Sequence, residues 1–166
     1  MVKNVDTGQM ERRRRGGRGP MVAPGRYKVR ISTGATERSV SLEVVVDPRV
    51  AADGITQADL EAQVDLCLQV GELSARASAL GSKLGRAQGD KKHQDVLQGL
   101  RSLRAELLTS TEGRYQRPML RDQIRYLSSM IDRADQRPGK DAFERATELD
   151  AWLTRLESTF REITGR

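Results

Sequence analysis

The fold is decided where the spacing of the apolar residues changes. Residues 39–73 read SVSLEVVVDPRVAADGITQADLEAQVDLCLQVGEL. In the first part, apolar and other residues alternate, which is typical of a β-strand with one buried face. In the second part, apolar residues recur at intervals of three and four, which is typical of an amphipathic helix. The segment therefore predicts a strand, a linker and a long helix, in that order.

The linker and the start of the helix each have a local signal. Pro48 disfavours helix in the residue before it, and Gly54 interrupts the chain again, so we expect residues 48–55 to be a linker. Thr56 is the expected N-cap of the long helix. Asp59, three residues later, completes an arrangement similar to a capping box.

Four amphipathic stretches follow the linker within residues 56–164. Each carries apolar residues at alternating spacings of four and three, which places them on one face of a helix. Polar loops marked by Gly or Pro separate them. We therefore predict an antiparallel four-helix bundle with a core made mainly of leucine. The expected core residues are Leu66, Val70, Leu73, Ala77, Leu80, Leu84, Val96, Leu100, Leu103, Leu107, Leu120, Ile124, Leu127, Ile131, Ala134, Ala146, Leu149, Leu153, Leu156, Phe160 and Ile163.

Upstream of the linker, residues 20–47 have the pattern of a β-hairpin. Tyr27, Val29 and Ile31 alternate with basic residues, STGATE supplies a turn, and residues 39–47 form the second strand. Two strands alone are marginal in water, so the hairpin needs a partner. We interpret it as the end of an immunoglobulin-like sandwich that docks onto a β-sheet in the same, longer chain or in another chain. The expected docking residues are Tyr27, Val29, Ile31, Val40, Leu42, Val44 and Val46. The chain is thus expected to be α+β and mainly α.

The net charge of +6 is concentrated at the N-terminus. Residues 1–30 hold nine of the 29 Lys and Arg but two of the 23 Asp and Glu, so the remainder is close to neutral. We expect residues 1–19 to be a disordered basic lead. The candidate phosphate contacts are Arg12, Arg13, Arg14, Arg15 and Arg18. An alternative function is therefore a stand-alone bundle whose arginine-rich tail binds nucleic acid or an acidic surface. Because the rest of the chain is close to neutral, binding of nucleic acid by the folded part is not favoured.

No set of residues supports catalysis. The single cysteine, Cys67, excludes an internal disulfide and a site with several cysteine ligands, and we expect it to pack as a small apolar side chain. Asp95 lies two residues from the single histidine, His93, and would not face it on a helix. We therefore predict a protein that is not an enzyme and has no cofactor and no metal site.

Two stretches resemble a bacterial family. The first comprises GPMVAPGRYKVRIS, a turn, SVSLEVVVDPRV and a helix that opens TQADLEAQVDLCLQVGEL; the second is MLRDQIRYLSSMIDRADQRPGKDAFERATELDAWLTRLESTF. Both are similar to the C-terminal end of large secreted Asp-box (BNR-repeat) β-propeller proteins, often labelled glycosyl hydrolase-like or sortilin-like. There, a small sandwich and a helical bundle follow the propellers. The resemblance covers residues 19–163 and implies the C-terminal fragment of a larger protein, with a structural or interaction role. Because the Asp-box motif itself is absent, no glycosidase activity is carried over.

The expected location depends on that resemblance. The sequence has no run of about 18 apolar residues, so no membrane-spanning helix is expected. It also opens without the apolar stretch of a secretory signal, so the chain as written is expected to stay in the cytoplasm. As part of the longer protein that it resembles, it would be periplasmic or extracellular.

Overall fold

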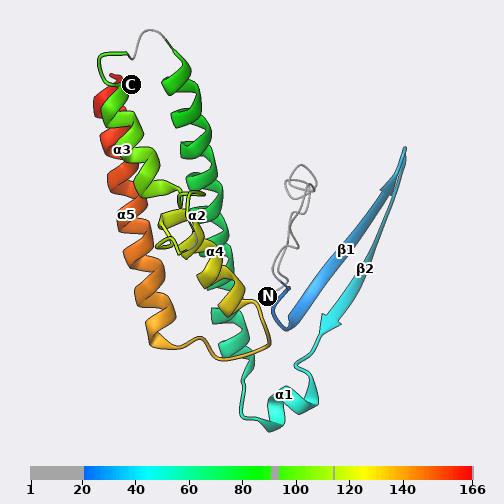
Figure 1. Cartoon of the computed structure of the whole chain (residues 1–166). Helices are drawn as coiled ribbons and strands as arrows, with labels where there is room; N and C mark the ends of the chain where they lie inside the picture. Colours follow the sequence, from blue (N-terminus) through cyan, green and yellow to red (C-terminus); the bar gives the residue numbers. More distant parts are fainter. Residues whose placement is uncertain (1–20, 91–93, 114, 166) are drawn as a thin grey trace. The chain divides into compact units, whose positions relative to one another are not determined.

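A computed structural model describes residues 21–90, 94–113 and 115–165. It confirms that the chain is α+β and mainly α, with a hairpin followed by helices (Figure 1). The elements are β1 (Gly25–Thr33), β2 (Thr36–Val44), α1 (Pro48–Ala52), α2 (Gln57–Gly89), α3 (Leu97–Leu107), α4 (Leu120–Ile131) and α5 (Lys140–Thr164).

The chain divides into two compact units. The hairpin unit runs to Asp65 and includes the segment Ala134–Arg137, and the bundle unit comprises Leu66–Arg133 and the residues from Pro138 onward. The division therefore falls inside α2, whereas the spacing of apolar residues placed the start of the bundle at residue 56.

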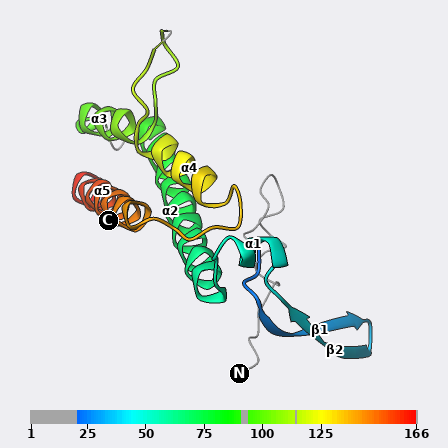
Figure 2. The ribbon, with the colours of Figure 1, turned by 90° about the horizontal axis from the view of Figure 1, so that it is seen from below.

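The hairpin pairs two strands of nine residues each. β1 and β2 are antiparallel and in register from Gly25 opposite Val44 to Thr33 opposite Thr36. Gly34, in the two-residue turn between them, has a φ of 57°, a left-handed conformation that such turns require. The strands therefore extend into the STGATE stretch that was predicted to be turn. Figure 2 shows the two strands side by side.

The predicted linker contains a short helix, α1, that sequence reasoning missed. The Asp47 carboxylate accepts a hydrogen bond from the Arg49 backbone N–H at 2.8 Å and an ion pair from the Arg49 side chain at 2.7 Å. Pro48 occupies the first turn, where its missing N–H costs nothing. Pro48 thus starts a helix here, in addition to disfavouring one in the residue before it.

The capping box at the start of α2 is confirmed. The Thr56 N–H donates to Asp59 Oδ2 at 2.9 Å, and the Asp59 N–H donates to Thr56 Oγ1 at 3.2 Å. The same carboxylate accepts two hydrogen bonds from the Arg137 guanidinium, at 2.7 and 3.1 Å. Asp59 therefore joins the first turn of α2 to the segment that follows α4.

This network predicts a loss of stability in acid. Hydrogen bonds from Arg137, and then from Thr56, hold the pKa of Asp59 well below its usual value. Because the folded pKa is depressed, the stabilisation is present above the unfolded pKa of about 3.9 and is lost progressively as pH falls from that value through the folded pKa. Urea unfolding at pH 7 and pH 3 should show a smaller acid loss for Asp59→Asn than for the wild type. An equal loss in both proteins would contradict this role.

Ala134 corrects one predicted core position. It was expected to be the last core residue of the third helix, but α4 ends at Ile131 and Ala134 is exposed. The Ala134 carbonyl instead accepts a hydrogen bond from Gln63 Nε2 at 2.7 Å, and Gln63 Oε1 accepts the Gln136 N–H at 3.3 Å. Gln63 is buried, and its amide satisfies backbone groups that α4 no longer pairs.

In the bundle unit, α3 and α4 follow one another along the two long helices (Figure 1). The α2 and α5 helices run parallel, because Arg76 contacts Asp150 and Glu157 while later residues of both helices line one groove. Gly81 of α2 lies near Leu107 of α3, and Gly85, one turn later in α2, lies near Arg104, which comes earlier in α3. These two helices are therefore antiparallel. The four predicted helices thus occupy three positions in the bundle: α2 holds one, α3 and α4 share the second, and α5 holds the third. The loop 108–119 separates α3 from α4.

The leucine core of this bundle is continuous from Leu66 to Leu156. Of the predicted core positions, Val96, Phe160 and Ile163 are half-buried and pack against its margin. The fully buried large side chains are Leu66, Val70, Leu84, Leu100, Leu107, Leu120, Ile124, Leu149 and Leu153. Within the described ranges, no helix combines the length and apolar character needed to cross a bilayer.

Cys67 packs against this core and is predicted to react slowly. Burial, with a smaller contribution from the charge of Asp132, raises the pKa of its thiol to about 11. The reactive thiolate is therefore scarce at pH 8. Iodoacetamide should alkylate the folded chain at least roughly tenfold more slowly than the chain in denaturant. Equal rates would show that the thiol is accessible and ionised in the fold.

Candidate functional site: the apolar face of the hairpin

One face of the hairpin is apolar, and the strand register builds it. Tyr27 lies opposite Leu42, and Val29 lies opposite Val40. Successive side chains of a strand point to opposite faces, so these two cross-strand pairs share a face. Ile31, whose partner is Arg38, extends the same face toward the turn.

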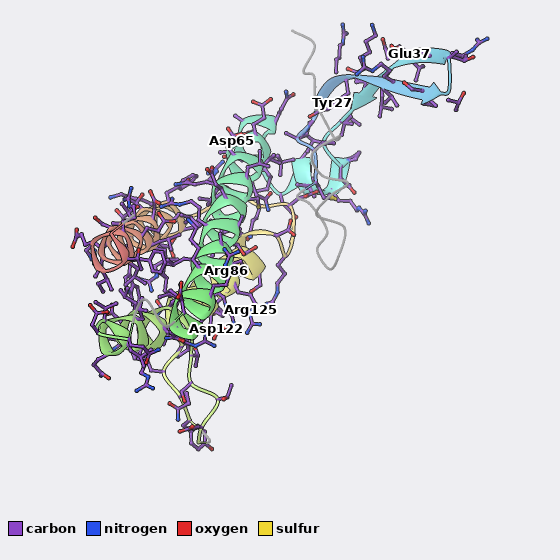
Figure 3. The ribbon with its side chains drawn as sticks, turned by 90° about the horizontal axis from the view of Figure 1, so that it is seen from above. Tyr27, Glu37, Asp65, Arg86, Asp122 and Arg125 are labelled. Carbon is purple, nitrogen blue, oxygen red and sulfur yellow. The ribbon has the colours of Figure 1, made fainter. Side chains whose placement is uncertain are left out.

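This face is open to solvent within the hairpin unit. Val29, Ile31, Val40 and Leu42 are 37%, 61%, 61% and 49% exposed. Scattered exposed apolar residues are normal on a protein surface, whereas a contiguous set marks an interaction site. Figure 3 places Tyr27 and Glu37 at different positions along the hairpin, with side chains projecting from both strands.

The opposite face is polar and cationic on one strand. Arg26 pairs with Glu43 at 4.0 Å, and Arg30 pairs with Glu37 at 3.8 Å. These pairs are exposed, and each contributes about 0–1 kcal/mol. Lys28 lies opposite Ser41 between them. The hairpin is therefore amphipathic, and only its apolar face gains from being covered.

Tyr27 differs from the rest of the apolar face because it is buried. Its hydroxyl donates a hydrogen bond to the Ala23 carbonyl, four residues upstream, and Ala23 is itself buried. Burial of a tyrosine costs little free energy when its hydroxyl keeps a hydrogen-bond partner. This hydrogen bond fixes the segment before β1 against the beginning of the strand.

The structure brings together six of the seven predicted docking residues. Val44, opposite Gly25, lies on the apolar face and is half-buried, whereas Val46 lies beyond the end of β2. The predicted phosphate contacts Arg12, Arg13, Arg14, Arg15 and Arg18 lie outside the described residues, as does His93.

Sequence reasoning missed three exposed apolar side chains near the base of the hairpin. Met21, Val22 and Val45 are all exposed. Met21 and Val22 precede the first alternating residue, and Val45 falls out of phase with its neighbours. The alternation of apolar residues therefore carried no signal for them, and only their exposure in the folded chain identifies them.

Among the residues that the structure describes, no three His, Cys, Asp or Glu side chains gather closely enough to hold a metal ion. Comparison with known proteins found no matching family model, no matching curated protein and no matching solved structure.

Proposed function

We propose that this chain is a non-catalytic structural module whose hairpin supplies two strands to a β-sandwich, with the helical bundle following that sandwich. The exposed apolar face of β1 and β2 carries the proposal. Covering a large apolar side chain stabilises a protein by about 1.5–3 kcal/mol, and four such side chains lie on this face. A two-stranded hairpin has little stability of its own, so a covering sheet also stabilises the strands themselves.

The Tyr27 contact supports a sandwich as the covering structure. In immunoglobulin-like sandwiches, a tyrosine near the start of a strand donates its hydroxyl to the backbone a few residues upstream and fixes a corner. Tyr27 is the third residue of β1 and makes a bond of this kind to Ala23. An apolar sheet face also suits the opposite layer of a sandwich, where two such faces interdigitate.

The resemblance to the C-terminal end of Asp-box propeller proteins supports a specific source for the remaining strands. They would belong to the same polypeptide, upstream of the basic lead at residues 1–19, and the module would follow a glycosyl hydrolase-like propeller. Its partner is then a β-sheet, and its location is periplasmic or extracellular. Any catalytic activity would reside in the propeller.

The mass of the native product tests this proposal. An antibody raised against residues 56–164 should detect, on a denaturing gel of cells and culture medium of the source organism, a species far above 18.5 kDa. A species at 18.5 kDa alone would overturn the longer polypeptide. Tagging the same gene at its 3′ end gives an independent control for the antibody.

A further inference from the structure

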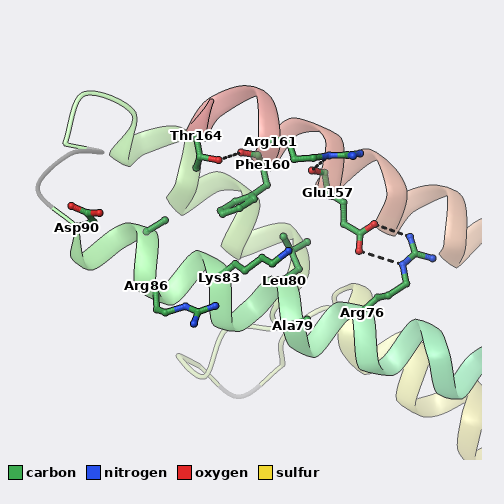
Figure 4. Close-up of a pocket in the computed structure, with 11 residues that line it drawn as sticks. Arg76, Ala79, Leu80, Lys83, Arg86, Asp90, Glu157, Phe160, Arg161 and Thr164 are labelled. Atoms are coloured by element: carbon green, nitrogen blue, oxygen red, sulfur yellow. Dashed lines mark hydrogen bonds and ion pairs between the residues drawn. The ribbon is translucent and has the colours of Figure 1, made fainter. Parts of the chain in front are cut away.

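A groove runs between α2 and α5 in the bundle unit (Figure 4). This open groove has a volume of about 810 Å³, within the range of about 300–1,000 Å³ that small-molecule sites occupy. Leu80 and Ala87 of α2 contribute apolar surface to it, and the Phe160 ring points from α5 toward α2. The groove therefore offers an apolar floor for the body of a ligand.

Cations outnumber carboxylates around this floor. Four basic side chains line the groove against two acidic ones; the basic residues are Arg76, Lys83, Arg86 and Arg161, and the acidic ones are Asp90 and Glu157. Lys83 and Arg86 make no ion pair with any residue that the structure describes. Because the chain after residue 30 is nearly neutral, this excess is local to the groove. It favours an anionic ligand.

Arg76 closes one end of the groove. Its guanidinium contacts Asp150 at 2.6 Å and Glu157 at 2.8 Å, and it donates to Thr154 at 3.1 Å. Hydrogen bonds to Glu157, the largest effect, and to Asp150 raise the pKa of Arg76, so the bridge between α2 and α5 stays charged. Arg76 thus holds the two helices together. At the rim, Arg161 donates its Nε–H to the Glu157 carbonyl at 3.3 Å, whereas Lys83 and Arg86 make no ion pair with the described residues.

The dimensions favour a small ligand over a helix. At 1.5 Å per residue, the α2 wall from Arg76 to Ala87 is about 17 Å long, and the α5 wall from Glu157 to Thr164 is about 10 Å long. Where both helices form its walls, the groove is thus less than two helical turns long, which is short for a docked helix that uses anchors at i, i+3, i+4 and i+7. The basic segment at residues 12–15 has the same charge as the rim, so it does not suit the groove either.

We propose that the groove binds an organic anion of small-molecule size. Its apolar body would lie over Leu80, Ala87 and Phe160. Its carboxylate, sulfonate or phosphate would meet the cations of the rim, Lys83, Arg86 and Arg161. No residue of the hairpin lines the groove, so a test of this site is independent of the sandwich proposal.

Binding of 1-anilinonaphthalene-8-sulfonate tests the groove. Fluorescence titration uses the full chain with Val29→Asp and Val40→Asp, which suppress binding of the dye to the hairpin. Adding Lys83→Glu and Arg86→Glu should weaken binding at least tenfold. The matched control, Arg101→Glu with Arg155→Glu, removes the same charge from exposed positions that do not line the groove and should leave the affinity within twofold.

Amide chemical shifts give a second readout of the same titration. The largest shifts should fall on residues 80–87 and 157–161, and 2-naphthoate should reproduce them while neutral 2-naphthalenemethanol should not. Equal weakening by the two charge reversals, or shifts centred elsewhere, would overturn the proposal. Binding of poly-L-glutamate without binding of either aromatic anion would assign the groove to an acidic protein chain, which also overturns it.

Discussion

Leu153→Ala is expected to destabilise the bundle by about 2–5 kcal/mol. Leu153 lies near the middle of α5 and is fully buried within the continuous leucine core. Removing its branched end takes away apolar contacts and leaves a cavity that close-packed helices cannot fill. Urea unfolding followed by the helical circular dichroism signal measures the loss.

Leu68→Ala is the matched control for this change. Leu68 lies on α2 in the same bundle unit, but it is 47% exposed. The same truncation there should change the free energy of unfolding by less than about 0.5 kcal/mol. Similar losses for the two variants would show that the leucine stripe does not form the core described above.

The combination of Val29→Asp and Val40→Asp is expected to weaken self-association of the purified chain at least roughly tenfold. These two side chains face each other across β1 and β2 on the apolar face, and both are exposed. In the absence of the natural sheet, a second hairpin is the nearest surface able to cover this face. Two carboxylates there must lose water on association, and the one cation among the strand residues of this face is Arg38, opposite Ile31. Sedimentation velocity over a range of concentrations measures the change.

Ser39→Asp with Ser41→Asp provides the control on the opposite face of the same strand. Ser39 lies opposite Arg30, and Ser41 lies opposite Lys28, so the new carboxylates meet cations. Association should be unchanged or slightly stronger. Equal weakening by both pairs of substitutions would indicate an effect of net charge and would contradict docking through the apolar face.

Elements with local signals could be predicted from the sequence. The Thr56–Asp59 capping box, the four helical stretches and the alternating strands each depend on residues within a few positions of one another. Pro48 shows the limit of such signals. The same residue that disfavours a helix before it also starts α1, where the Asp47 side chain caps the new helix, and a proline alone does not announce the second effect.

The arrangement of the helices could not be predicted in the same way. All four stretches share the same spacing of three and four, so the spacing identifies a buried face without identifying the helix that covers it. The parallel pairing of α2 with α5 depends on Arg76 reaching Asp150 and Glu157, more than 70 positions away. The groove beside Phe160 results from that pairing and has no motif of its own.

The apolar face of the hairpin could be predicted from the local alternation of apolar residues. The structure that covers this face could not. Alternation in β1 and β2 indicates that one face is to be covered, and the register of the folded hairpin places Val29 opposite Val40 on that face. Alternation says nothing about which chain does the covering. Tyr27 is the exception within that face, because its hydroxyl finds the Ala23 carbonyl and its burial needs no further chain.

In the native protein, the apolar face of the hairpin is proposed to be covered by a β-sheet. Site-specific photo-crosslinking tests it most directly, with p-benzoylphenylalanine at Val40 on the apolar face and at Ser39 on the polar face, in cells of the source organism. If a β-sheet covers the apolar face, position 40 should give a strong crosslink to a segment of alternating apolar residues, and position 39 should give little. Equal crosslinking from both positions, or crosslinks from position 40 to helices α2–α5 of this chain, would contradict it.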